Sequence, residues 1–84
     1  MEYMYYTYVL ESKSGKRYVG QTNNLERRLF EHNNGLTRYT TKQRTQWKVI
    51  YYETFPTRSE AMKREAYFKT GKGRDFVRVA VASA

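Results

Sequence analysis

The stretch from 17 to 32 constrains the fold of this chain more than any other. It reads as a short β-prone run, a turn and a helix, because Asn23 followed three residues later by Glu26 is a capping-box pattern that starts a helix near Asn24. The stripe of an amphipathic helix turns toward the core. Polar groups held there cost free energy unless they are satisfied or used. On this helix the stripe mixes apolar and polar side chains: Leu25, Arg28, Leu29 and His32.

The length and the missing cysteines limit what the chain can be. Its 84 residues (1–84) form one small domain with a thin core. The sequence has no cysteine and one histidine, which excludes disulfides and a zinc site of the usual His/Cys kind. No signal peptide or long apolar run is present, so we expect a soluble, cytoplasmic protein without a membrane partner.

The net charge of +8 implies an anionic partner, with nucleic acid first and a membrane surface or another polyanion second. The sequence also has nine tyrosines, which suit base stacking but equally suit strands and a small core. A polar stretch at 36–46 has four threonines. Its cations are candidates for contact with a phosphate backbone, the alternative being a solvated loop. These cations are Arg38, Lys42 and Arg44.

The remaining periodicity predicts an α+β fold with a small three-stranded antiparallel or mixed sheet flanked by helices. Residues 3–10 are β-prone with both faces covered, and 16–21 return antiparallel after a Ser14-Gly15 turn. Residues 47–54 form the third strand. A helix then runs from a capping box through about 70 and closes at Gly71, giving the order ββαβα with a final helix.

The capping box of this second helix is formed by Thr57 and Glu60, and Glu60 is placed to pair with Arg64 on the outside. Beyond it, the segment 74–84 fits either a helical stripe or a strand, and we favour a short helix. The predicted inward stripe of the second helix is Ala61, Met62, Glu65 and Phe68.

Each of the two longer helices therefore carries ionisable groups on a core-facing stripe. If both helices pack on one face of the sheet, Arg28, His32 and Glu65 come together beside Tyr8 and Tyr18. The alternative is a buried Arg–Glu ion pair, with the histidine satisfied by a neighbour. Three such groups in a chain this short favour a functional site.

The same positions resemble a known family. Tyr6-Thr7-Tyr8, then Tyr18-Val19-Gly20, then Arg28, His32 and Glu65 together are similar to a GIY-YIG nuclease domain, and the resemblance covers essentially the whole chain. It is closest to small stand-alone bacterial members. The first triplet departs from the pattern in its first two positions, which we interpret as packing positions.

The resemblance implies a role for each matching residue. Tyr8 and Tyr18 match the two tyrosines of the site, and Gly20 matches the glycine that allows a close backbone approach. Arg28 matches the arginine that contacts the scissile phosphate, and His32 stands where relatives have histidine or tyrosine.

Glu65 matches the only protein carboxylate that holds the divalent metal, Mg²⁺ or Mn²⁺. One carboxylate can suffice, because Mg²⁺ keeps several waters and shares substrate phosphates. Lys69, at i+4 from Glu65, is expected to restrain that carboxylate or to contact nucleic acid. The alternative is an ordinary helix pair.

The general base stays open among Tyr8, Tyr18 and His32. A tyrosine of pKa about 10 is only ~0.1% ionised at neutral pH, whereas histidine titrates near 6.5. We therefore expect a tyrosine to contact the water while His32 takes or relays the proton. Gln21 stands where several relatives have a lysine, which removes one alternative base.

The predicted function is that of a metal-dependent endonuclease that acts on DNA rather than RNA, with branched or damaged DNA as a candidate substrate. The alternative is a nucleic-acid-binding module on the same fold with weak or lost cleavage. In relatives, further domains or partner proteins often direct cutting, so a protein partner that supplies target specificity is part of the expectation.

Overall fold

The computed structural model describes residues 4–37 and 46–83. The candidate phosphate contacts Arg38, Lys42 and Arg44 lie outside the described residues. Among the described helices, none has the length and apolar character needed to cross a membrane.

The sheet has three strands, β1 (Tyr5–Ser12), β2 (Arg17–Thr22) and β3 (Trp47–Phe55), in the spatial order β2-β1-β3. β1 is central and pairs antiparallel with both neighbours, so the predicted α+β class is confirmed and the sheet is antiparallel rather than mixed. The predicted hairpin turn is present: Gly15 adopts φ of +88°, a conformation that glycine reaches without steric cost.

The helices are α1 (Leu25–Asn33), α2 (Arg58–Phe68) and α3 (Gly71–Ala82), which gives the order ββαβαα. The N-cap of α1 is Asn24, one residue later than predicted, and its side chain accepts a hydrogen bond from the Arg27 backbone N–H. Thr57 caps α2 as predicted. The C-terminal segment is a helix, and it begins at Gly71, the residue that was expected to end α2.

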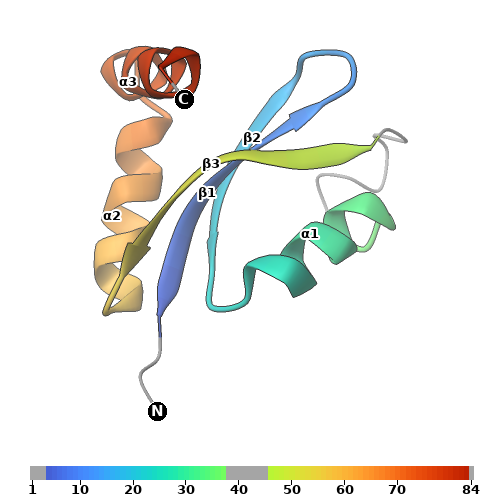
Figure 1. Ribbon diagram of the computed structural model, residues 1–84. Coiled ribbons are helices and arrows are strands. Elements are labelled where there is room, and N and C mark those ends of the chain that lie inside the picture. Colours follow the sequence, from blue (N-terminus) through green and yellow to red (C-terminus); the bar gives the residue numbers. More distant parts are fainter. Residues whose placement is uncertain (1–3, 38–45, 84) are drawn as a thin grey trace.

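The helices lie on opposite faces of the sheet (Figure 1). On one face, α1 contributes Leu25 and Leu29 to a core around Tyr8, Leu10 and Trp47. The condition stated above for the convergence of Arg28, His32 and Glu65, that both helices pack on one face, is therefore not met. The physical reason lies in β1, which places Tyr8 and Leu10 on one face and Val9 on the other, so that both faces need cover. The core of the other face, beneath α2 and α3, is formed by Val9, Phe68 and Val77.

The predicted inward stripe of α2 is correct except for Met62, whose residue is 52% exposed. Ala61 is fully buried, and its carbonyl oxygen accepts a 2.7 Å hydrogen bond from the Thr7 hydroxyl of β1. The predicted Glu60–Arg64 pair is replaced by another: Arg64 binds both carboxylate oxygens of Glu53 on β3, at 2.8 and 3.3 Å. These contacts fix α2 against the sheet.

Candidate active site

The hydroxyl group of Tyr8 is the centre of the candidate site. Tyr8 lies on the central strand and is 1% exposed. Its oxygen lies 3.2 Å from Nε2 of His32 and accepts a hydrogen bond from Nε of Arg28 at 3.3 Å. The polar stripe of α1 predicted from the sequence therefore meets the first tyrosine triplet, and the two polar side chains of that stripe share one partner.

Gly20 is the residue of β2 that lies directly opposite Tyr8 in the strand pairing. A Cβ atom at Gly20 would lie 2.5 Å from the Tyr8 hydroxyl oxygen and 3.0 Å from Cε1 of Tyr18. The phenol of Tyr8 therefore lies over bare backbone at the edge strand. A side chain at this position would force the phenol to move.

Tyr18 completes the aromatic part of the site from the same edge strand. Its ring centroid lies 4.6 Å from that of His32 and 6.3 Å from that of Tyr8. Unlike Tyr8, Tyr18 is only partly buried, so it borders solvent at the rim of the group.

His32 is buried at 1% exposure, and both of its ring nitrogens have partners. Nδ1 lies 3.4 Å from the hydroxyl of Thr37, a residue that the sequence did not single out because no spacing rule links it to the helix. We assign the Tyr8 proton to the contact with Nε2, in which case the ring proton of neutral His32 lies on Nδ1 and faces the hydroxyl of Thr37.

Burial, followed by the positive charge of Arg28, lowers the pKa of His32 to about 4. This corrects the expectation of a pKa near 6.5. The imidazole is neutral at pH 7 and is a weaker proton acceptor than predicted.

The pKa values of the other two residues at this contact, Tyr8 and Arg28, are raised. Burial raises the pKa of Tyr8 to about 12, against the opposing hydrogen bond from Arg28. Burial alone would lower the pKa of Arg28, but its hydrogen bonds to Tyr8 and Glu31 outweigh this and raise it. Arg28 is therefore a permanent cation beside a neutral phenol. Its Nη1 forms a 3.1 Å ion pair with Glu31, and its side chain is 35% exposed.

Glu65 approaches the group from the other layer of the fold. It is partly buried on α2, and one carboxylate oxygen accepts a 2.8 Å hydrogen bond from Lys69, the predicted i+4 partner. α2 packs against the edge strand β2 as well as against β1. The charge of Glu65 contributes to the raised pKa of Tyr8. The structure thus gathers Tyr8, Tyr18, Arg28 and His32 in direct contact, with Glu65 on the far side of the sheet edge.

The donor set at Glu65 limits which ion could bind there. Within the described ranges, no group of three or more His, Cys, Asp or Glu side chains could hold a metal ion. A single carboxylate that is 23% exposed fits an ion that keeps its waters, such as Mg²⁺, and does not fit a closed protein cage. Nearby, the Gln21 side chain accepts a 3.0 Å hydrogen bond from Arg58, so a cation does reach the position where relatives were expected to have lysine.

Comparison with known proteins gives one family match and several similar proteins. The family described as the GIY-YIG catalytic domain matches residues 4–76. A UPF0213 protein of Clostridium perfringens is 44% identical over 66 residues, which cover 79% of this chain and 71% of that protein. One from Bacillus licheniformis is 46% identical over 65 residues, covering 77% and 67%. The solution NMR structure of a UPF0213 protein from Bacillus halodurans, 28% identical, has a TM-score of 0.55 and covers 92% of this chain and 84% of that chain.

Proposed function

This chain belongs to the GIY-YIG family, and we propose that it is an endonuclease that hydrolyses phosphodiester bonds in DNA. The observation that carries the proposal is the contact between Tyr8, His32 and Arg28 above the bare backbone of Gly20. A buried phenol, a neutral imidazole and a cation that meet at one oxygen are more than packing requires.

Arg28 is the phosphate ligand in this proposal. Its guanidinium stays charged, is partly exposed and is held by Tyr8 on one side and Glu31 on the other. A cation fixed in this way offsets the negative charge that develops on the phosphate oxygens in the transition state. Lysine would keep the charge but lose the two-sided restraint.

Tyr8 and His32 handle the proton of the attacking water. The water gives a proton to the phenol oxygen of Tyr8 while the proton of Tyr8 moves to Nε2 of His32 along the 3.2 Å contact. With a pKa of about 4, His32 holds that proton in only about one molecule in a thousand at pH 7. Protonating it at this pH therefore costs roughly 4 kcal/mol of free energy. It therefore serves as a transient carrier. After the bond has broken, the proton passes back through Tyr8 to a solvent water, and the leaving oxygen takes a proton from solvent.

Glu65 is the residue that would hold a divalent ion, Mg²⁺ or Mn²⁺, in the proposed enzyme. When bound, such an ion supplies charge stabilisation at the phosphate and the leaving oxygen. Lys69 binds one oxygen of the carboxylate at 2.8 Å, so the second oxygen is the one through which Glu65 would hold the ion.

The test is incubation of the protein with branched, nicked and linear DNA, with and without Mg²⁺, followed by gel analysis of the products. We expect cutting that depends on Mg²⁺ and falls at least about 100-fold in Glu65→Gln. The matched control is Glu60→Gln, which removes the same charge five residues earlier on α2 at an exposed position. If neither the wild type nor Glu65→Gln cuts DNA but both bind it, the result would instead support a nucleic-acid-binding module without cleavage.

A further inference from the structure

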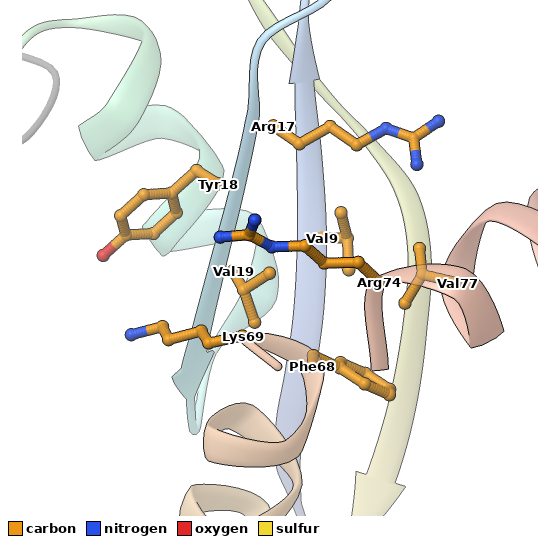
Figure 2. A pocket seen from close by; sticks show the side chains of 8 residues that line it. All are labelled: Val9, Arg17, Tyr18, Val19, Phe68, Lys69, Arg74 and Val77. Carbon is orange, nitrogen blue, oxygen red and sulfur yellow. The ribbon is translucent and has the colours of Figure 1, made fainter. Parts of the chain in front are cut away.

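A groove adjoins the candidate site on the face of the sheet that α2 and α3 cover. It has a volume of about 500 Å³, within the range of sites that bind small ligands. Its floor is apolar: Val19 of β2 is partly buried at the surface of the groove, and the buried core residues Val9, Phe68 and Val77 lie beneath it (Figure 2). None of these residues takes part in the proposed reaction.

The rim of the groove is cationic. Arg17, Lys69 and Arg74 line it, and Tyr18 forms the wall that it shares with the candidate site. Arg17 is paired with Glu11 at 3.2 Å and Lys69 with Glu65 at 2.8 Å. Arg74 forms no ion pair with any residue that the structure describes. In Figure 2 its side chain extends from α3 across the groove toward β2, past Val19.

An apolar floor beneath a cationic rim matches a ligand with a flat apolar part and an attached anion. A nucleoside phosphate is such a ligand, since its base has a π-face and its phosphate binds arginine well. A base inside a duplex is stacked and paired, so it can enter a groove of this kind only when it is unpaired.

We propose that this groove binds the base of an unpaired nucleotide of the substrate strand, with Arg74 on its phosphate. The inference rests on the proposed function, because Tyr18 joins the groove to the site and Lys69 joins it to Glu65. It gives the substrate a requirement: the strand must be unpaired next to the bond that is cut.

An assay that measures DNA binding under conditions where no cutting occurs tests the groove separately from the reaction. Fluorescence anisotropy in EDTA, at one salt concentration, compares a labelled single strand with a duplex of the same length. Charge alone favours the duplex, which has the denser phosphates. We expect the single strand to bind at least about tenfold tighter, and Arg74→Glu to abolish this preference. Arg78→Glu is the matched control, because it makes the same charge change on α3 at a residue outside the groove.

A second substrate separates the base from the phosphate. In a single strand with consecutive abasic nucleotides the phosphates remain but no base can enter the groove. We therefore expect the wild type to bind this strand with little of its preference over the duplex. Equal binding of single strand and duplex by the wild type would overturn the proposal, as would equal losses in Arg74→Glu and Arg78→Glu. If free AMP binds saturably and as tightly as the single strand, the proposal that the groove binds a nucleotide of the substrate strand would be overturned. Thermal unfolding of each variant checks that it is folded. A failure of Mg²⁺-dependent cutting leaves these binding results unchanged.

Discussion

At the scale of single residues, the hydroxyl of Tyr8 meets two side chains of α1 that act on it in different ways. Arg28 donates to its oxygen and His32 is placed to accept its proton. Burial keeps the phenol un-ionised, with a pKa of about 12, and keeps the imidazole neutral, with a pKa of about 4. The contact therefore joins a neutral donor to a neutral acceptor, a suitable starting state for moving a proton without a stable ion.

Replacing His32 separates positioning from proton transfer. His32→Gln retains an acceptor near the place of Nε2 but cannot take up a proton, whereas His32→Ala removes both functions. If His32 carries the proton, both variants lose roughly 100-fold or more in cleavage rate. Single-turnover cleavage measured from pH 5 to 8 is the assay. A His32→Gln protein that cuts as fast as the wild type would limit the histidine to orienting Tyr8.

Gly20 can be tested by the addition of one methyl group. In Gly20→Ala the new Cβ meets the Tyr8 hydroxyl at 2.5 Å, so we expect about 1–3 kcal/mol of lost stability and a displaced phenol. Adding Tyr8→Phe removes the closest atom, and part of the stability should return although activity does not. Urea unfolding measures both effects. Gly71→Ala is the control, because nothing lies within 4 Å of its added Cβ. Equal stability of the two alanine variants would contradict the close approach.

At the scale of elements, the α2–α3 corner holds the far side of the fold together. The Cβ of an alanine at Gly73 would overlap the Tyr67 backbone carbonyl, which belongs to the preceding helix. Arg64 also lies against the rings of Phe68 and Phe76, each 4.8 Å from its guanidinium carbon. The two helices can meet at this angle only because residue 73 has no side chain.

Gly73→Ala should therefore destabilise the protein more than Gly20→Ala, because a backbone carbonyl cannot move aside as a phenol can. We expect a loss of about 3 kcal/mol or more. Each kcal/mol corresponds to a fall of about 4–8 °C in Tm for a domain of this size. Thermal unfolding followed by circular dichroism measures it, with Gly71→Ala two residues away as the reference. A Tm unchanged from that reference would show that the corner can open without cost.

The elements also show how far the sequence could predict the structure. The strands, the first two helices and the polar stripe of Arg28 and His32 on α1 follow from local periodicity and caps, which act over a few residues. The face on which α2 packs does not, because it depends on which apolar residues of the assembled sheet remain uncovered on each face. Arg64 pairs with Glu53 and not with Glu60 for the same reason: the strand partner is distant in sequence and is placed by tertiary packing.

Met62 and Thr37 are single residues whose positions local sequence patterns also could not predict. A residue at the edge of a helical stripe turns inward or outward according to what lies beneath the helix, and Met62 turns out. Thr37 reaches His32 through the turn after α1, where no periodicity applies. The lowered pKa of His32 arises from burial and from Arg28, so it too required the folded structure.

At the scale of the whole molecule, the buried histidine couples stability to pH. Its folded pKa of about 4 lies below the ordinary value of 6.5. Between these values the unfolded chain binds a proton that the folded chain does not. Stability is therefore complete above pH 6.5 and is lost as the pH falls toward 4, by roughly 3 kcal/mol.

Urea unfolding at pH 7 and at pH 4.5 measures this loss. Because other groups titrate as well, the relevant quantity is the difference between the wild type and His32→Gln, which has no proton to gain. We expect the wild type to lose about 2 kcal/mol more than the variant over this range. Equal losses in the two proteins would mean that His32 keeps an ordinary pKa when folded.

The central position of β1 has a consequence for how the protein becomes active. Its alternate residues serve two purposes: Tyr8 and Leu10 face α1, whereas Thr7 and Val9 face α2 and α3. A slip of one residue along β1 would exchange these sets, burying the reactive phenol under the wrong helices and leaving a threonine in its place. Correct alignment of the hairpin and assembly of the reaction centre are thus a single event. A refolding chain should recover its tertiary signal and its cutting ability together.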